Sequence, residues 1–283
     1  MNRRRFLALS AAALATPADA QTRWQGRAFG ADCALTLSGP ARQIKAALAT
    51  LATLIETIEA DFSLHRPSAL TSLNATGHLA APSPAFRAVM DLADAVHRLT
   101  GGAFDPTVQP LWQAAARGRA NAAPIGWHHI RRGADIVLKP GMALTFNGIA
   151  QGFGADAIKA HLAAHGFDHA LVDMGETTAL GGPFRLGLQD PVYGQLATRT
   201  LTGTAIATSS PKATLLNGQS HILHPRGLPP LWSTVSVEAT SAALADALAT
   251  ALVFLTADQI AALRNPGLIR VMLVDFDGNL LTV

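Results

Sequence analysis

Apolar residues recur with a helical period over several stretches of the chain. In residues 41–63 they fall three or four positions apart, a spacing that places side chains on one face of a helix. This stretch therefore predicts a long amphipathic helix. Its expected buried face consists of Ile44, Leu48, Leu51, Ile55 and Ile58.

Capping residues mark the ends of further helices. Ser83 followed by Pro84 predicts a helix start, because serine accepts hydrogen bonds from the first amides and proline fits the first helical position. Glycine after the last periodic residue predicts a helix end. The remaining helices are expected over 152–165 with a stop at Gly166, over 240–255, and after a cap at Thr256.

Short apolar runs bounded by turn residues predict β-strands. Residues 268–283 contain two such runs around Asp277-Gly278, a typical hairpin turn. The segment 114–125 is the most loop-like. Together these elements predict a mixed α/β (α+β) fold, and periodicity leaves the strand order open. The other expected strands are 33–37, 170–174, 184–188 and 233–239.

Composition places the chain among globular proteins. Its 283 residues are 49% hydrophobic and 14% charged, which is typical of a folded domain with a sizeable core. The net charge is +3, but residues 1–20 contribute three arginines against one aspartate. The nearly neutral remainder gives no electrostatic reason to bind nucleic acid. Cys33 is the only cysteine, which excludes an intrachain disulfide and a cysteine-based metal site.

Residues 1–20 are interpreted as an export signal peptide. Arg3, Arg4, Phe6 and Leu7 stand in the positions of a twin-arginine signal. The apolar run that follows is too short to span a bilayer. It is followed by Ala18-Asp19-Ala20, a small-x-small cleavage signal. We therefore expect a periplasmic mature domain of residues 21–283, with an ordinary secretory signal as the alternative.

Two glycine-containing segments and one histidine-containing loop are candidates for ligand binding. In 100–112 and 144–158, glycines lie beside turn or helix-start residues, where backbone groups can approach a phosphate or a metal. A tightly packed turn is the alternative for both. Asp105 lies in the first segment, and a turn aspartate is expected to contribute little to the core. The loop 220–230 carries two histidines and an arginine, for which a solvated turn is the alternative.

Asp246 and Thr250 are four residues apart in an expected helix. They therefore share one face, and their carboxylate and hydroxyl can serve one hard cation. The polar stripe of an amphipathic helix is the alternative explanation.

In chain order, these motifs resemble the FAD:protein FMN transferase (ApbE) family from about residue 24 to 283. GRAFGADCALTL at 26–37 begins the likeness, and GGAFDPTVQPLW at 101–112 is very close to the family pattern. FNGIAQGFGADAI, LVDMGETTALGG, SHILHPRGLPP and VSVEATSAALADALATAL follow in the family's order. The resemblance implies the fold of this family.

The resemblance also implies roles for individual residues. It implies a magnesium site formed by the Gly148 carbonyl, Asp246 and Thr250. His221 and Ile222 begin the loop that closes on the nucleotide, and His221 is the candidate general base. The residues implied to bind FAD are Phe29, His65, Ala103, Phe104, Asp105, Thr145, Gln151, His221 and Ile222.

The reaction implied by the resemblance is Mg²⁺-dependent transfer of FMN from FAD to a threonine or serine hydroxyl of an acceptor protein, with release of AMP. Membrane redox subunits exposed on the same side are the expected class of acceptor. Two alternatives remain open: an exported flavin carrier without transfer activity, and a pyrophosphatase that splits FAD into FMN and AMP.

The chain departs from the family pattern at several positions. Thr145 and His224 each replace an aspartate, and Gln151 stands where many members have lysine. Glu176 stands where members have a second glycine, so that turn is expected to be one residue shorter. Residues 207–213 replace a stretch that normally carries glycine and an aromatic–arginine pair.

Overall fold

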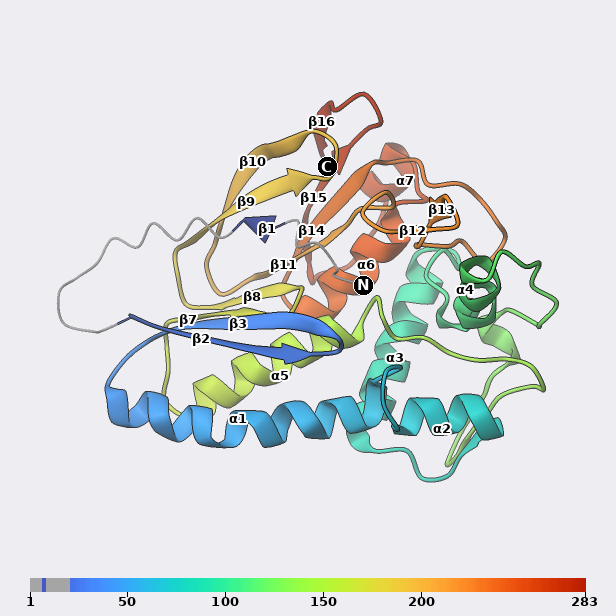
Figure 1. Cartoon of the computed structure of the whole chain (residues 1–283). Helices are drawn as coiled ribbons and strands as arrows, with labels where there is room; N and C mark the ends of the chain where they lie inside the picture. The colour runs from blue at the N-terminus through green and yellow to red at the C-terminus, as the bar shows by residue number, and fades with distance from the viewer. Residues whose placement is uncertain (1–6, 9–20) are drawn as a thin grey trace.

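The computed structural model describes residues 7–8 and 21–283. At its centre is an eight-stranded sheet in the order β16-β15-β14-β11-β8-β7-β3-β2 (Figure 1). Every neighbouring pair in this sheet is antiparallel. Its strands are β2 (Gln21–Ala28), β3 (Ala31–Ser38), β7 (Ala170–Asp173), β8 (Thr177–Leu180), β11 (Ala205–Ser209), β14 (Thr234–Ala239), β15 (Leu268–Val274) and β16 (Leu280–Thr282).

A smaller sheet covers one face of the large one. It contains β9 (Phe184–Asp190) between β10 (Gly194–Leu201) and β1 (Leu7–Ala8). Apolar residues of the two sheets form a common cluster, to which the small sheet contributes Phe184, Leu186 and Leu188. The remaining short strands are β4 (His78–Leu79), β5 (Arg131–Arg132), β6 (Ile136–Val137), β12 (Leu215–Leu216) and β13 (Gln219–Ser220).

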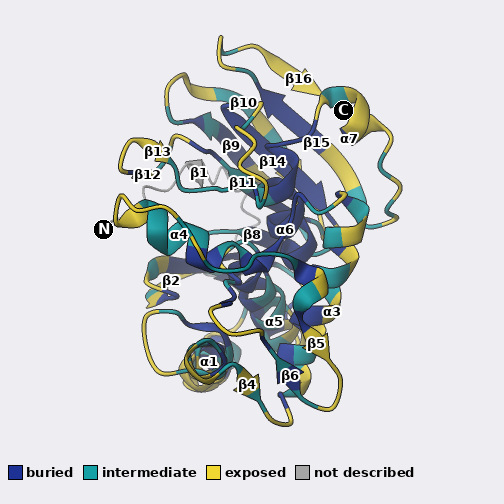
Figure 2. Cartoon of the chain, turned by 90° about the vertical axis from the view of Figure 1, so that its right-hand side faces the viewer, coloured by how far each residue is buried: buried dark blue, intermediate teal, exposed yellow. Residues whose placement is uncertain are grey.

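Helices cover the opposite face of the large sheet, and the main core lies between them and the strands. α5 and α6 run through its middle and are largely buried (Figure 2). Among the described residues, no helix combines the length and the apolar composition needed to cross a membrane. The helices are α1 (Ala41–Phe62), α2 (Ala69–Thr76), α3 (Pro84–Leu99), α4 (Gln109–Ala116), α5 (Ala150–Ala164), α6 (Ala242–Leu252) and α7 (Ala257–Ala261), with 3₁₀ turns η1 (Pro106–Val108) and η2 (Trp127–His129).

Most of the helices and strands expected from periodicity are present. α1 buries Ile44, Leu51, Ile55 and Ile58, as its pattern predicts, whereas Leu48 is only partly buried against the core. The Ser83 hydroxyl accepts the Phe86 amide at the start of α3. The hairpin of β15 and β16 turns at Asp277 and Gly278, and Gly278 has a φ of +88°.

Two of these expectations need correction. α6 is shorter than 240–255, because the Ser241 hydroxyl accepts the Leu244 amide and begins the helix there. The segment 114–125 is a loop only in part, since α4 continues through Ala116. The residues carrying the twin-arginine and cleavage signals, Arg3, Arg4, Phe6 and Ala18-Asp19-Ala20, lie outside the described residues, whereas Leu7 is in β1.

Candidate functional site

The N-termini of α5 and α6 meet at a backbone-to-backbone contact. A β-carbon on Gly152, in the first turn of α5, would lie 2.3 Å from the carbonyl oxygen of Ala242, the first residue of α6. Only glycine allows this approach. The contact brings the segment before α5 next to the face of α6 that carries Asp246 and Thr250.

Asp246 points into this junction. Its side chain is buried, with 4% of its surface exposed, and its Oδ2 accepts a hydrogen bond from the Gly152 amide at 3.3 Å. A carboxylate at a helix N-terminus is stabilised by the unpaired amides and by the helix dipole. All residues from Ala242 to Ala249 are buried, so the polar stripe of a solvent-facing helix does not explain Asp246.

Gly148 and Thr250 are in direct contact across the same junction. A β-carbon on Gly148 would lie 2.6 Å from the Thr250 Oγ1. Gly148 immediately precedes Ile149, the N-cap of α5. The three residues predicted to bind magnesium therefore come together, although Gly148 is about 100 positions away from Asp246 and Thr250 in sequence.

The chemistry of this set suits magnesium. A carboxylate, a hydroxyl and a carbonyl are hard oxygen donors, and Mg²⁺ prefers such donors and commonly completes its coordination with substrate phosphates and water. The described residues contain no cluster of three or more His, Cys, Asp or Glu side chains able to hold a metal. A site with one carboxylate would therefore need oxygens from the substrate or from water.

Phe29 packs against α5, and His65 lies beside the residue that follows Phe29. The Phe29 amide donates to Glu59 Oε1 at 2.7 Å, and its ring approaches Gly154 of α5. The His65 ring is exposed to solvent and lies beside Gly30, which follows Phe29 in the chain. These two predicted nucleotide contacts are thus neighbours.

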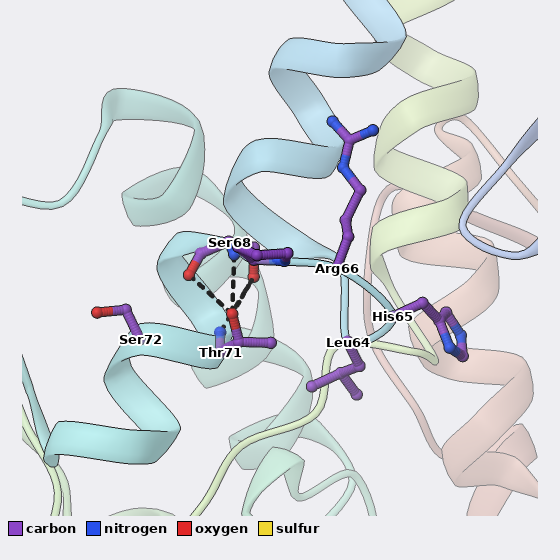
Figure 3. Close-up of a pocket in the computed structure, with 7 residues that line it drawn as sticks. Leu64, His65, Arg66, Ser68, Thr71 and Ser72 are labelled. Atoms are coloured by element: carbon purple, nitrogen blue, oxygen red, sulfur yellow. Dashed lines mark hydrogen bonds between the residues drawn. The ribbon is translucent and has the colours of Figure 1, made fainter.

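An open hollow of about 490 Å³ lies along the turn between α1 and α2 (Figure 3). Of the residues predicted to bind FAD, only His65 lines it. Figure 3 shows His65 turned away from Ser68, Thr71 and Ser72. The opposite wall is held by the α2 cap, in which the Ser68 hydroxyl accepts the Thr71 amide.

The Asp105 side chain is buried and forms several hydrogen bonds, although the residue lies in a turn. It is buried with Ala103 and Phe104. Its Oδ1 accepts from the Thr107 amide at 2.9 Å and from the Thr107 hydroxyl at 2.6 Å, and its Oδ2 accepts from the Trp127 amide at 3.1 Å. The expectation that Asp105 contributes little to the core is therefore wrong, because its carboxylate joins two separate segments.

His221 follows β13, in the loop where the sequence places it. Its Nδ1 lies 2.9 Å from the Thr214 carbonyl oxygen. A carbonyl can only accept, so Nδ1 carries a proton in this bond, and in the neutral imidazole the lone pair is then on Nε2. Ile222, the next residue, packs against the main core.

Comparison with known proteins identifies the family. The model of the ApbE family matches residues 29–273. The chain belongs to the ApbE family. The FAD:protein FMN transferase of Treponema pallidum (strain Nichols) is 33% identical over 175 residues, which cover 53% of this chain and 47% of that protein. The match thus spans about half the length of this curated relative.

Solved ApbE structures share the fold. The flavin transferase ApbE from Vibrio cholerae superposes with a TM-score of 0.79 at 23% identity and covers 94% of this chain and 97% of that one. The ApbE protein of Thermotoga maritima gives a TM-score of 0.81 at 20% identity, covering 93% and 96%. The mixed α+β architecture is therefore that of ApbE structures.

Two departures from the ApbE pattern keep a local structural role. Thr145 Oγ1 accepts the Asn147 amide at 3.2 Å, a turn bond that an aspartate would also make. The Thr145 amide donates to the Pro106 carbonyl and so connects the glycine-rich segment to the Asp105 turn. Gln151 is buried and donates from Nε2 to the Met174 carbonyl, linking α5 to the β7–β8 turn.

Glu176 and His224 also form specific contacts. Glu176 lies in the turn between β7 and β8 and accepts the Thr208 amide at 3.3 Å. His224 has 3% of its surface exposed, and its Nδ1 accepts the Arg226 amide at 3.0 Å. Burial, with the charge of Arg226 nearby, lowers the pKa of His224, and the charge of Asp105 opposes this effect.

Sequence reasoning gave Asn74 no role. The Asn74 side chain donates to the Leu144 carbonyl at 2.8 Å and accepts the Leu144 amide at 2.7 Å. This paired bond fixes the backbone just before Thr145. An isolated asparagine at the end of a helix gave no pattern from which this partner, 70 residues away, was predictable.

Proposed function

We propose that this chain is a magnesium-dependent FAD:protein FMN transferase, which moves FMN from FAD to a serine or threonine hydroxyl of an acceptor protein. Its membership in the ApbE family supports this assignment, as does the name of its relative from Treponema pallidum. The observation that carries the proposal is the meeting of Gly148, Asp246 and Thr250 at the α5–α6 junction.

In this proposal, Mg²⁺ is held by the Gly148 carbonyl, the Asp246 carboxylate and the Thr250 hydroxyl. When bound, it supplies positive charge that stabilises the pyrophosphate of FAD during phosphoryl transfer. The Gly152 amide at the start of α5 holds the Asp246 carboxylate at this junction, so the carboxylate is oriented before the cation binds.

The reaction replaces the phosphoanhydride bond between the two halves of FAD with a phosphoester bond to the acceptor. The acceptor hydroxyl oxygen bonds to the phosphorus of the FMN half of FAD. The bond from that phosphorus to the bridging oxygen breaks, and AMP leaves with the bridging oxygen and its electron pair. The hydroxyl proton goes to a general base, and His221 is our candidate because its Nε2 carries the lone pair.

We further propose that the reaction takes place in the periplasm. The arginine pair and the small-x-small signal within residues 1–20 support export. An acceptor exposed on the same side of the membrane, such as a subunit of a membrane redox complex, fits this location.

One assay distinguishes transfer from the two alternative activities. The purified protein is incubated with FAD, Mg²⁺ and a candidate acceptor, and the products are separated on a denaturing gel and by chromatography. Flavin fluorescence that stays with the acceptor supports transfer. Free FMN without labelled acceptor indicates the pyrophosphatase, and unchanged FAD bound to the protein indicates the carrier.

Two variants control this assay. Asp246→Ala removes the charged ligand and should give no labelled acceptor. Asp258→Ala removes an exposed carboxylate of α7 and should behave like the wild type. Equal labelling by all three proteins would contradict the proposed site.

A further inference from the structure

The N-terminus of α6 is capped by a side chain from α5. Asp156, in the second turn of α5, accepts the Ala242 amide through Oδ1 at 2.9 Å and the Ala243 amide through Oδ2 at 3.0 Å. The Ser241 hydroxyl accepts the next amide, that of Leu244. The first three amides of α6, which have no partner within the helix, are thus satisfied, two of them by Asp156.

The N-terminus of α5 is likewise contacted by a carboxylate from α6. Asp246 of α6 accepts the Gly152 amide in the first turn of α5. Asp156 lies four residues after Gly152, and Asp246 lies four residues after Ala242. Each helix therefore places a carboxylate from its second turn against the N-terminus of the other.

This reciprocal pair matters because the proposed metal ligands are divided between the two helices. Gly148 belongs to the segment that begins α5, whereas Asp246 and Thr250 belong to α6. The separation between these oxygens depends on how α6 sits against α5. Mg²⁺ requires oxygens at about 2.0–2.1 Å in near-ideal octahedral geometry, so a small shift of α6 weakens the site.

We propose that Asp156 is a positioning residue for the metal site: by fixing the start of α6 against α5, it sets the position of Asp246 and Thr250 relative to Gly148. This inference rests on the proposed function, since it presupposes the magnesium site. Asp156 itself is not a ligand in this proposal. It acts through the two amides that it holds.

A purely structural role for Asp156 makes a different prediction. If Asp156 only stabilises the fold, its loss lowers the midpoint of thermal unfolding and leaves the metal affinity of the folded protein unchanged. Asp156→Asn is the sharpest change. Asparagine keeps one acceptor oxygen, but its NH₂ group replaces the other oxygen and faces a backbone N–H.

Asp190 provides a matched control. It is a buried carboxylate that also accepts two consecutive backbone amides, those of Val192 and Tyr193, at 2.7 and 3.0 Å. Its other bonds go to the hydroxyls of Ser233 and Thr234. None of these four partners belongs to α5 or α6, so Asp190→Asn should destabilise the fold without disturbing the junction.

The test measures Mn²⁺ binding, with Mn²⁺ as a paramagnetic probe for the Mg²⁺ site, by titration of the full-length protein followed by electron paramagnetic resonance. The wild type, Asp156→Asn, Asp190→Asn and Asp246→Ala are compared at a temperature where each is folded. Asp156→Asn should weaken Mn²⁺ binding about 10- to 100-fold, the range typical of residues that orient metal ligands. Asp190→Asn should bind Mn²⁺ like the wild type, and Asp246→Ala should not bind it.

Rescue gives a second readout. All three proposed ligands remain in Asp156→Asn, so excess Mg²⁺ should restore FMN transfer in this variant but not in Asp246→Ala. If Asp156→Asn does not fold, Ser241→Ala loosens the same end of α6 more mildly and should weaken Mn²⁺ binding several-fold.

The outcomes separate the two proposals. Wild-type Mn²⁺ affinity in Asp156→Asn, or in Ser241→Ala when the first variant does not fold, overturns the positioning role while the metal site stands. A wild-type protein that binds no Mn²⁺, or an Asp246→Ala variant that binds it normally, overturns the metal site and this inference with it.

Discussion

Gly148 and Thr250 are so close that a β-carbon on Gly148 would lie 2.6 Å from the Thr250 Oγ1 and 3.1 Å from its Cβ and Cγ2. Thr250 is a half-buried residue on α6, and its neighbours Ala249 and Ala251 are buried. The start of α5 is packed against α6 by the close backbone contact at Gly152. The absence of a side chain at position 148 is therefore a condition for the two segments to meet.

Gly148→Ala should consequently destabilise the protein and disturb the junction. Overpacking of a rigid interior costs about 1–3 kcal/mol, which thermal unfolding can measure. In a Thr250→Ala background, where the hydroxyl and methyl group are absent, Gly148→Ala should lower the free energy of unfolding by less. Equal costs in both backgrounds would show that the two side chains do not compete for space.

Asp105→Ala should lower stability as well as FAD binding. The substitution leaves the buried amides of Thr107 and Trp127 without their acceptor, and each such loss costs about 1–3 kcal/mol. Chemical denaturation measures this change, and FAD titration of the folded fraction measures binding. Asp135, a half-buried aspartate that accepts the Ala81 amide and lies outside the predicted FAD-binding residues, is the control, and Asp135→Ala should leave FAD affinity unchanged. An unchanged FAD dissociation constant in Asp105→Ala would remove this turn from the nucleotide site.

Asp105 also illustrates what sequence reasoning could and could not establish. Periodicity and caps predicted α1, α3 and the last hairpin because those signals are local. The partner of Asp105, Trp127, is 22 residues away and has no sequence pattern of its own. Likewise, the burial of Asp246 depends on α5, which its own helix does not reveal.

The short elements were missed for a related reason. α2 has eight residues and a weak apolar pattern, and it depends on a capping box between Ser68 and Thr71. The strand order of the large sheet was not predictable, because β11 lies between β8 and β14 only through long-range pairing. The spacing of Asp246 and Thr250 was predictable, and the third member, Gly148, came from family resemblance.

His224 predicts a specific pH dependence of stability. Its pKa is lowered in the folded protein by burial and Arg226, so the unfolded state binds a proton first as the pH falls. Its contribution to stability is present above about pH 6.5, the ordinary value for histidine, and is lost as the pH falls through that value towards the lowered folded-state pKa. Protonation of Nδ1 also removes the bond from the Arg226 amide.

The measurement compares the wild type with His224→Asn, whose amide oxygen can accept the Arg226 amide and does not titrate. Between pH 7 and 5 the wild type should lose more unfolding free energy, by up to about 1.4 kcal/mol per pH unit for one proton. Parallel pH profiles would show that His224 does not carry the effect and that other titrating groups dominate.

If residues 1–20 are a cleaved export signal, the mature N-terminus should be at or near Gln21. Changing Arg3 and Arg4 together to lysine should stop translocation, because twin-arginine export reads the arginine pair and a general secretory signal needs only positive charge. N-terminal sequencing of the periplasmic protein and fractionation of the double variant test both points. Normal periplasmic accumulation of the double variant would indicate a general secretory signal.

The metal site predicts an order of severity among ligand variants. Asp246 is the only charged member of the proposed set, and Mg²⁺ gains most from an anionic oxygen, while water can partly replace a hydroxyl. Asp246→Ala should therefore abolish FMN transfer, and Asp246→Asn should nearly do so despite its similar shape. Thr250→Ala should reduce transfer on the order of 10- to 100-fold.

Magnesium titration separates loss of a ligand from loss of structure. Excess Mg²⁺ should partly restore FMN transfer by Thr250→Ala, because the carboxylate and the carbonyl that remain still form a weaker metal site. It should not restore transfer by Asp246→Ala, which lacks the negative charge that holds the cation. Asp246→Ala also leaves the Gly152 amide without its acceptor, so its folded fraction must be measured by circular dichroism at the assay temperature. A folded Asp246→Ala protein that retained full magnesium-dependent transfer would place the metal elsewhere, because Asp246 is the only charged ligand in the proposed set.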